Sequence, residues 1–329
     1  MLQGRVLITG YTGFVGSHMA DYLLAEHDCE VVGATRWRSD RQNVKHLENN
    51  ERITTCELDL LDPASLNQAL KIHEPDYIIH FAAQSSPQSS FKVPVQTLRT
   101  NIEGSVNLYE AIRNHGKKSV RTVVVSSSEV YGNPLPEEVP IKETNPIRAA
   151  NPYSISKVGA DFMAQYYQKA YDLDLIITRM FSHEGARRGL DFALSSFAHQ
   201  IVLAERDQYV INSIKVGNLD SVRSYIHVSD AVRAYALALG QGWRGEIYNI
   251  GGSDTFTVRE ALTKLIAAST IPRDCFKIEV CPELLRPTDI TLQIPNCEKF
   301  QFHTGWVPTT GLDEIVQDLL NYWRTRILL

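Results

Sequence analysis

Four side chains that can carry protons fall in one short part of the chain, residues 126–157. Tyr153 and Lys157 are four residues apart, so on a helix they share one face and lie one turn from each other. A lysine ammonium beside a phenol favours the phenolate, which predicts that Lys157 makes Tyr153 a usable proton carrier near neutral pH. An amphipathic helix with a solvated lysine has the same spacing. The neighbouring motifs must therefore show whether this pair is catalytic.

Ser127 and Glu129 follow the apolar run at residues 123–125, which predicts a buried strand. Open α/β sheets place their chemistry at the carboxyl ends of such strands. A hydroxyl and a carboxylate at this place are therefore candidates for acid–base work. The candidate catalytic residues are Ser127, Glu129, Tyr153 and Lys157.

A glycine-rich turn connects the first predicted strand, residues 5–9, to a helical pattern at residues 17–24. In such a turn the first glycine permits the bend, the second lets the backbone approach a pyrophosphate, and the third lets helix and strand pack closely. The spacing is Gly-x-x-Gly-x-x-Gly, not the commoner Gly-x-Gly-x-x-Gly, and the alternative is a tight connection without a ligand. The predicted dinucleotide site contains Gly10, Thr12, Gly13, Phe14, Val15 and Gly16.

The second predicted strand, residues 30–35, leads into Arg36 and not into a carboxylate. A carboxylate there would bind the ribose hydroxyls of NAD, whereas a guanidinium suits the 2′-phosphate of NADP. The sequence therefore favours NADP, with NAD as the alternative cofactor and a solvated surface arginine as the alternative role of Arg36.

Two more strand ends are predicted to face the cofactor. Asp59 and Leu60 close a strand at residues 52–58, where Asp59 is expected either to accept from the adenine amino group or to cap the helix after Asp62. A strand at residues 77–81 is followed by small residues across which a flat cofactor can lie. The predicted contacts of these two strand ends are Asp59, Leu60, Ala82, Ala83, Gln84 and Ser85.

The composition excludes several classes of protein. The chain has 329 residues, of which 43% are apolar, as expected for one large or two smaller globular domains. Its net charge of -5 gives no reason to expect a nucleic-acid or membrane partner. The five cysteines form no Cys-x-x-Cys pair, so reduced thiols and no metal site are expected. Without a secretory signal or a bilayer-spanning apolar run, a cytoplasmic location is predicted.

Strands that alternate with helices through the first part of the chain imply a parallel sheet wound on both faces, the Rossmann-like α/β class. The glycine turn and the motifs at the later strand ends, taken with Tyr153 and Lys157, resemble those of the extended short-chain dehydrogenase/reductase family along nearly the whole chain. The likeness is greatest to GDP-mannose 4,6-dehydratases and the related GDP-4-keto-6-deoxymannose reductases.

Three segments carry the narrower resemblance. Ser127-Ser128-Glu129 resembles the Thr-Ser-Glu of GDP-mannose dehydratases. Residues 36–47 resemble the basic loop that binds NADP in those enzymes and reaches a neighbouring subunit, which implies a homodimer or homotetramer. Residues 187–189 and 216–223 resemble their nucleotide-sugar segments.

The resemblance implies a domain organisation. A dinucleotide-binding domain is expected at residues 1–180, joined by segments around 225–250, and residues 181–329 are expected to form mainly a smaller, mixed α/β cap that binds the nucleotide sugar. It also implies that His183 lies near the nicotinamide, with a histidine that donates to backbone as the alternative, and that Tyr153 and Lys157 contact the cofactor. The implied substrate contacts are Ser85, Glu129, Arg188, Asn218, Arg223 and Arg286. For each arginine, the alternative is a surface residue or the partner of a carboxylate.

The implied activity is a 4,6-dehydration of GDP-mannose or a close GDP-sugar with internal recycling of hydride through NADP. A GDP-4-keto-6-deoxymannose reductase, a C4 oxidoreductase and, more remotely, a non-catalytic NADP-binding sensor are the alternatives. Two positions depart from the family pattern: Ser182 stands where relatives have asparagine, and Ser224 where they have aspartate. Both are expected to face the sugar nucleotide.

Overall fold

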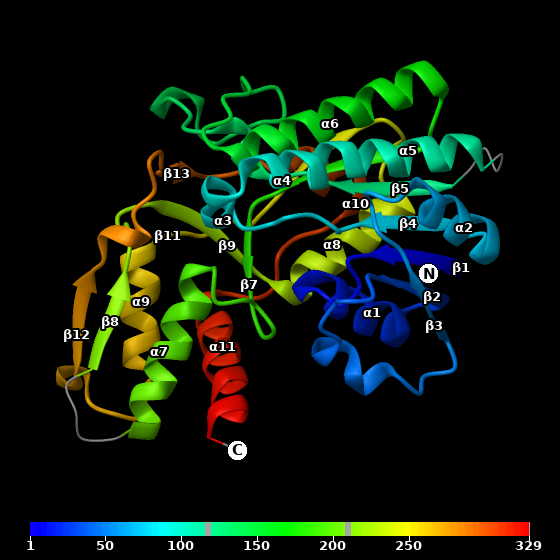
Figure 1. The fold of residues 1–329 in the computed structure, drawn as a ribbon. Coiled ribbons are helices and arrows are strands. Elements are labelled where there is room, and N and C mark those ends of the chain that lie inside the picture. The colour runs from blue at the N-terminus through cyan, green and yellow to red at the C-terminus, as the bar shows by residue number, and fades with distance from the viewer. Residues whose placement is uncertain (116–119, 208–211, 329) are drawn as a thin grey trace.

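The computed structural model describes residues 1–115, 120–207 and 212–328 (Figure 1). Its centre is a seven-stranded sheet in the order β10-β6-β5-β4-β1-β2-β3, and every neighbouring pair is parallel. The strands are β1 (Gln3–Thr9), β2 (Asp28–Thr35), β3 (Ile53–Glu57), β4 (Tyr77–His80), β5 (Arg121–Val125), β6 (Leu175–Met180) and β10 (Ile247–Ile250). The strand order reverses between β1 and β4, the place where open α/β sheets bind ligands.

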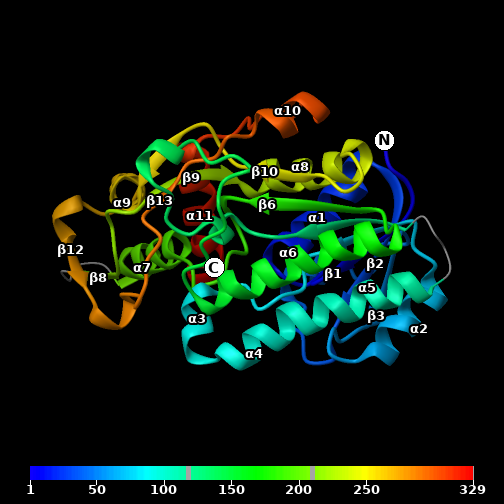
Figure 2. The same ribbon diagram turned by 90° about the horizontal axis from the view of Figure 1, so that it is seen from above.

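Helices cover both faces of this sheet, as the alternating pattern predicts (Figures 1 and 2). One face packs against α1 (Phe14–Glu26) and α8 (Val228–Gln241), and the other against α2 (Pro63–His73), α5 (Gly104–Asn114) and α6 (Pro152–Tyr171). Residues of β1 and β5 alternate between the two cores, because successive side chains of a strand point to opposite faces. The doubly wound fold is confirmed.

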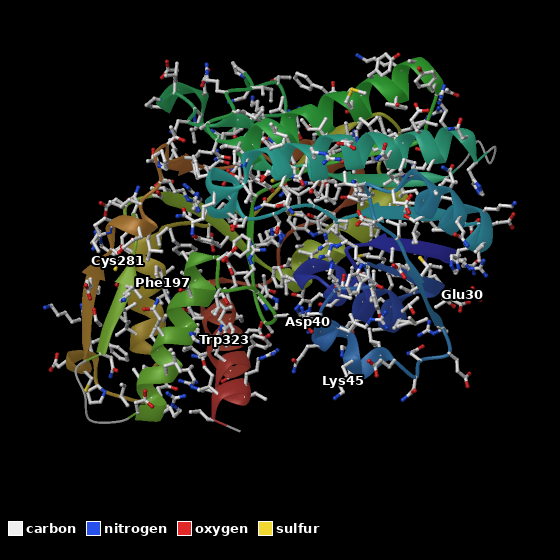
Figure 3. All side chains as sticks on the ribbon, in the orientation of Figure 1. Glu30, Asp40, Lys45, Phe197, Cys281 and Trp323 are labelled. Carbon is white, nitrogen blue, oxygen red and sulfur yellow. The ribbon has the colours of Figure 1, made fainter. Side chains whose placement is uncertain are left out.

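A smaller mixed part follows β6 and has its own apolar core between α7 (Ala193–Asp207), α9 (Val258–Ala267) and α11 (Leu312–Ile327). Phe197 and Trp323, labelled in Figure 3, belong to this core. Its strand β9 (Val222–His227) pairs in parallel with β7 (Ser182–Glu184) and β13 (Leu292–Gln293) and antiparallel with β11 (Thr255–Thr257). A separate pair joins β8 (Asn212–Val216) to β12 (Phe276–Val280).

The last third of the chain returns to the main sheet more than once. Helix α8 and strand β10 do so first, and Phe300 on α10 (Glu298–Thr304) and Trp306 after it then pack in the same core as α1. Two short helices, α3 (Pro87–Lys92) and α4 (Pro94–Leu98), connect β4 towards α5. The predicted domain bounds of 1–180 and 181–329 stay a prediction. Residues from both ranges pack in the core on the α1 face of the main sheet.

No helix within the three described ranges is both long and apolar enough to cross a bilayer. The same residues contain no group of three or more His, Cys, Asp or Glu side chains placed to hold a metal ion.

Candidate active site

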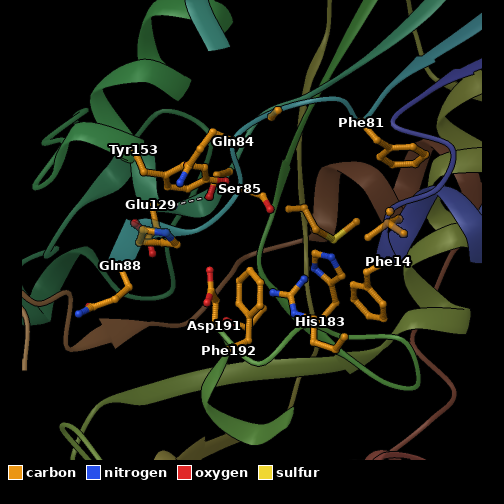
Figure 4. Close-up of a pocket in the computed structure, with 18 of the residues that line it drawn as sticks. Phe14, Phe81, Gln84, Ser85, Gln88, Glu129, Tyr153, His183, Asp191 and Phe192 are labelled. Carbon is orange, nitrogen blue, oxygen red and sulfur yellow. Dashed lines mark hydrogen bonds between the residues drawn. The ribbon is translucent and has the colours of Figure 1, made fainter. Parts of the chain in front are cut away.

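One cavity of about 670 Å³ lies between the carboxyl ends of the sheet strands and the smaller part, and every residue predicted for the site lines it. Figure 4 shows part of its lining: Tyr153 and Glu129 lie beside each other on one side of the view, and Phe14 and His183 lie together on the other. The structure therefore brings the predicted catalytic, cofactor and substrate residues together in one place.

The glycine turn forms a close backbone cradle at the start of α1. Gly10 has a φ of 71°, and its carbonyl accepts from the Gly13 N–H at 3.0 Å. A Cβ on Gly16 would lie 2.2 Å from that carbonyl oxygen, so only glycine fits. Gly13 is the N-cap of α1 and makes no side-chain cap bond, which leaves the helix N–H groups open to an anion. These features fit the pyrophosphate of a dinucleotide.

Arg36 and Asp59 line the far end of this cavity, where the adenosine of a dinucleotide would lie. Both side chains are exposed, and Arg36 directly follows β2. The Asp59 carboxylate accepts from the Leu61 N–H at 3.0 Å, and α2 is capped by Asp62, which accepts from the Ala64 N–H. The alternative that Asp59 caps α2 is therefore wrong.

The strip at residues 82–85 is held in place by Asn101, a buried residue near the start of α5. The Asn101 side chain accepts from the Gln84 N–H at 2.8 Å and donates to the Gln84 carbonyl at 3.0 Å. It also donates to the Ser156 hydroxyl at 2.8 Å, which ties the strip to α6. This network fixes the backbone across which the cofactor is expected to lie.

Tyr153 and Lys157 lie on α6 as predicted, but the electrostatics differ from the expectation. Burial raises the pKa of Tyr153 above its usual range, and the charge of Glu129 raises that pKa further, while the neighbouring Ser127 hydroxyl lowers it. Lys157 donates to the Val125 carbonyl at 2.8 Å, and burial lowers its pKa to about 8. The prediction that Lys157 makes Tyr153 more acidic is wrong for this structure, because the ammonium is held at β5 while the phenol is buried beside a carboxylate.

Ser127 caps a short 3-10 turn (Ser128–Tyr131) after β5, and Glu129 lies in its first turn. The Ser127 hydroxyl accepts from the Glu129 N–H at 3.2 Å. The Glu129 carboxylate accepts from the Asn151 side-chain amide at 2.9 Å and lies 4.0 Å from the Arg286 guanidinium. The carboxylate is thus held at the cavity wall next to the phenol of Tyr153.

His183 and Arg188 line the cavity beside Phe14 of the glycine turn. The His183 ring stacks on Phe14 with centroids 5.7 Å apart, and its Nδ1 faces the Phe181 carbonyl at 3.1 Å. Burial, aided by the charge of Arg188, lowers the pKa of His183 to about 3, so the ring is neutral and donates to that carbonyl. The Arg188 guanidinium lies 3.4 Å from the Phe192 ring centroid and 4.8 Å from that of Phe14, which places it between the predicted cofactor and substrate regions.

Asn218, Arg223 and Arg286 gather at the substrate end. Asn218 donates to Asp289 at 2.7 Å, and Arg286 lies 3.9 Å from the same carboxylate. Arg223 donates to the carbonyls of Val222 and Ile290. Arg223 and Arg286 supply the guanidinium donors that suit a diphosphate, and the carboxylates of Glu129 and Asp289 lie close to them.

The two departures from the family pattern lie in different places. Ser182 lines the cavity, as expected. Ser224 does not face the sugar nucleotide: it is buried, and its hydroxyl accepts from the Gly252 N–H and donates to the Gly252 carbonyl, both at 2.8 Å. That part of the expectation is wrong, because Ser224 joins β9 to the chain after β10.

Several residues of the cavity wall escaped the sequence analysis, among them Glu184, Tyr225, Tyr235 and Asp289. Burial raises the pKa of Glu184 to about 7, against the opposing charge of Arg188, whose side chain lies 3.7 Å away. Glu184 directly follows His183 in the sequence, and Asp289 follows Arg286 by three residues. For Glu184 and Asp289, this closeness in sequence to predicted site residues is the signal that would have indicated them.

The parallel sheet, the glycine cradle and the Tyr153–Lys157 helix define the extended short-chain dehydrogenase/reductase class. Within it, the chain belongs to the family described as GDP-mannose 4,6 dehydratase, whose model matches residues 7–319.

Individual relatives include both kinds of family enzyme. GDP-mannose 4,6 dehydratase of Cricetulus griseus is 30% identical over 95% of this chain and 90% of its own length. GDP-6-deoxy-D-mannose reductase of Pseudomonas aeruginosa is 28% identical over 98% of both chains. The solved structure of RMD from Pseudomonas aeruginosa, complexed with NADPH, is 26% identical, has a TM-score of 0.83, and covers 98% of this chain and 99% of its own.

Proposed function

We propose that this protein is a nucleotide-sugar 4,6-dehydratase that converts GDP-mannose, or a close GDP-sugar, to the GDP-4-keto-6-deoxy sugar. The observation that carries the proposal is the placement of Glu129: its carboxylate lines the cavity beside Tyr153. A C4 oxidation alone needs the phenol, whereas a dehydration also needs a base for the C5 proton. The residues of the site act as follows.

NADP is the cofactor, and when bound it accepts the hydride that leaves C4 and returns it to C6. The glycine cradle of Gly10, Gly13 and Gly16 holds its pyrophosphate, and the Arg36 guanidinium at the cavity's edge binds its 2′-phosphate. Lys157 orients the nicotinamide ribose. NAD is the alternative cofactor if the Arg36 guanidinium does not bind a 2′-phosphate.

The proton chemistry falls to three side chains. Tyr153 must act as a phenolate to take the proton of the 4-hydroxyl as hydride leaves C4. The Ser127 hydroxyl, which lowers the pKa of that phenol, also steadies the charge that develops on the 4-oxygen. The resulting ketone acidifies C5–H, and Glu129 removes this proton. The two protons that Tyr153 and Glu129 have taken up are then given to the departing C6 hydroxyl, which leaves as water, and back to C5, while C6 receives the hydride. The products are one keto sugar and one water, and the cofactor ends as it began.

The substrate's diphosphate is assigned to Arg223 and Arg286, with Asn218 beside them and Arg188 at the border with the cofactor. Ser85, which also lines the cavity, completes the sugar site. The oligomer is expected to be a homodimer or a homotetramer.

The test supplies the protein with GDP-mannose and NADP. A 4-keto-6-deoxy product without net formation of NADPH supports the dehydratase. Accumulation of NADPH contradicts it and identifies a C4 oxidoreductase. Unchanged turnover by Tyr153→Phe would show that this site performs no hydride chemistry.

A GDP-4-keto-6-deoxymannose reductase is the second candidate. The favouring observation is length: the Pseudomonas aeruginosa reductase and this chain each align over 98% of their residues, whereas the Cricetulus griseus dehydratase aligns over 90% of its own. No reaction with GDP-mannose, together with consumption of NADPH on the keto sugar, identifies the reductase.

A further inference from the structure

Asn151 lies where the turn that carries Glu129 meets the helix that carries Tyr153. It is 3% exposed and is not part of the cavity wall. Its side chain makes two contacts: Oδ1 accepts from the Ser154 N–H at 2.8 Å, and Nδ2 donates to Glu129 Oε2 at 2.9 Å. One buried amide therefore joins the start of α6 to the predicted base.

The orientation of this amide is fixed by its partners. A backbone N–H can only donate, so the side-chain oxygen of Asn151 must face Ser154. A carboxylate can only accept, so the side-chain nitrogen must face Glu129. Turning the amide over would leave both contacts unmade inside the protein, where an unsatisfied polar group costs about 1–3 kcal/mol. The cap of α6 therefore fixes the Asn151 amide so that its nitrogen, and not its oxygen, faces Glu129.

The two oxygens of Glu129 have different surroundings. Oε2 is bound by the amide, and in the described residues this is the one side chain that hydrogen-bonds the carboxylate. Oε1 lies 4.0 Å from the Arg286 guanidinium, beyond hydrogen-bond distance. The phenol of Tyr153 on α6 and the guanidinium of Arg223 on β9 also act electrostatically on Glu129.

We propose that Asn151 is a positioning residue for the base: it holds Glu129 Oε2 so that Oε1 is presented to the C5 proton. The inference rests on the proposed dehydratase function. Because Tyr153 lies two residues after Asn151 in the same helix, the amide also sets the place of the base relative to the phenol. Asn151 acts through Glu129 and does not touch the substrate.

Three variants separate positioning from helix capping. Asn151→Ser and Asn151→Asp each keep an oxygen that can cap α6 but lose the side-chain amide nitrogen that donates to Glu129. Ser154→Ala is the matched control, because it removes the hydroxyl that accepts from the Asn151 N–H at 3.0 Å and leaves the contact with Glu129 intact. Thermal unfolding of each variant confirms that it is folded.

Two readouts are followed in single turnovers of GDP-mannose in D2O with NADP: the transient NADPH absorbance for the oxidation at C4, and deuterium at C5 of the sugar. Asn151→Ser is expected to slow deuterium incorporation at least tenfold while C4 oxidation changes less than threefold. Asn151→Asp adds a carboxylate beside Glu129, so the acid limb of the C5 exchange rate is expected to move up by about one pH unit, since like charges oppose each other's ionisation. Ser154→Ala is expected to change neither readout by more than threefold.

Deuterium incorporation at the wild-type rate in Asn151→Ser overturns the inference. Equal slowing of both readouts in Asn151→Ser and in Ser154→Ala also overturns it, because the residue then serves only as a cap. A wild-type protein that does not exchange C5 at all overturns the proposed function, and this inference with it, which distinguishes the two failures.

Discussion

The guanidinium of Arg286 lies 4.0 Å from the carboxylate of Glu129 and 3.9 Å from that of Asp289. Arg286 thus belongs both to the wall assigned to the diphosphate and to the surroundings of the proposed base. Its side chain remains 27% exposed, so it can reach an anion that enters the cavity. This link between substrate binding and base leads to the first prediction.

Arg286→Gln is expected to raise the dissociation constant for GDP-mannose by about 10–100-fold, since a hydrogen bond to a charged group contributes about 1.5–3 kcal/mol. NADP affinity should change less than threefold, because Arg286 lies at the substrate end. Isothermal titration calorimetry measures both. Arg259→Gln, which removes an exposed ion pair with Asp220, is the control and should bind as the wild type does. Equal binding by Arg286→Gln would remove this residue from the diphosphate site.

Arg36→Ala is expected to weaken NADP binding by about tenfold or more and NAD binding by less than threefold, because only NADP carries the 2′-phosphate. Arg38→Ala is the matched control: its guanidinium lies 5.0 Å from the Trp37 ring centroid, outside the cavity wall. Fluorescence titration with the two cofactors gives the comparison. A similar loss for both cofactors would contradict the assignment of Arg36.

Lys157→Met is expected to stabilise the protein at pH 7. Burial lowers the pKa of Lys157 from 10.5 to about 8, so the folded state binds its proton more weakly than the unfolded state does. Below about pH 8 this costs about 3 kcal/mol, and the cost disappears as the pH rises towards 10.5. The variant leaves the Val125 carbonyl without its donor, at about 1 kcal/mol, so the net gain at pH 7 is about 2 kcal/mol.

Urea unfolding of Lys157→Met at pH 7 and at pH 10 tests the sign. The gain should shrink or reverse at the higher pH. The exposed Lys142→Met serves as control and should change the free energy of unfolding little at either pH. A variant that is less stable than the wild type at pH 7 would show that burial of this ammonium carries no such cost.

Gly16→Ala is expected to lose at least tenfold in NADP affinity, or about 2 kcal/mol or more in stability. The new Cβ would lie 2.2 Å from the Gly10 carbonyl oxygen, and backbone on this side cannot move without opening the cradle. Gly240→Ala on α8 is the control, because its nearest neighbour, a Leu2 methyl, lies 3.5 Å away. It should gain about 0.5–1 kcal/mol from helix propensity. Wild-type affinity and stability in Gly16→Ala would contradict the close cradle.

The main sheet could be predicted because its evidence is local. The apolar run at β5 and the glycine turn after β1 each mark a strand end within a few residues, and parallel strands bring such ends to one edge. The candidate site followed from those ends and from the resemblance to a known family. Its residues meet in one cavity, and their individual roles stay predictions.

Other features depend on contacts between distant parts of the chain. Trp306 packs in the core beside α1, and nothing in its own neighbourhood indicates that partner. The pKa of Tyr153 depends on its burial and on Glu129, which lies 24 positions earlier in the chain, and not on the helix spacing alone. Strand β12 was missed although its sequence, FKIEV, alternates apolar and charged residues, a signal that a closer search for period two would find.

The proposed dehydration depends most directly on removal of the C5 proton by Glu129. Single turnover of GDP-mannose in D2O with NADP tests it most directly, comparing the wild type with Glu129→Gln by mass spectrometry of the sugar. We predict deuterium at C5 of the wild-type product and, in Glu129→Gln, continued oxidation at C4 with exchange at C5 slowed by about 100-fold or more. Undiminished exchange at C5 in Glu129→Gln would contradict it.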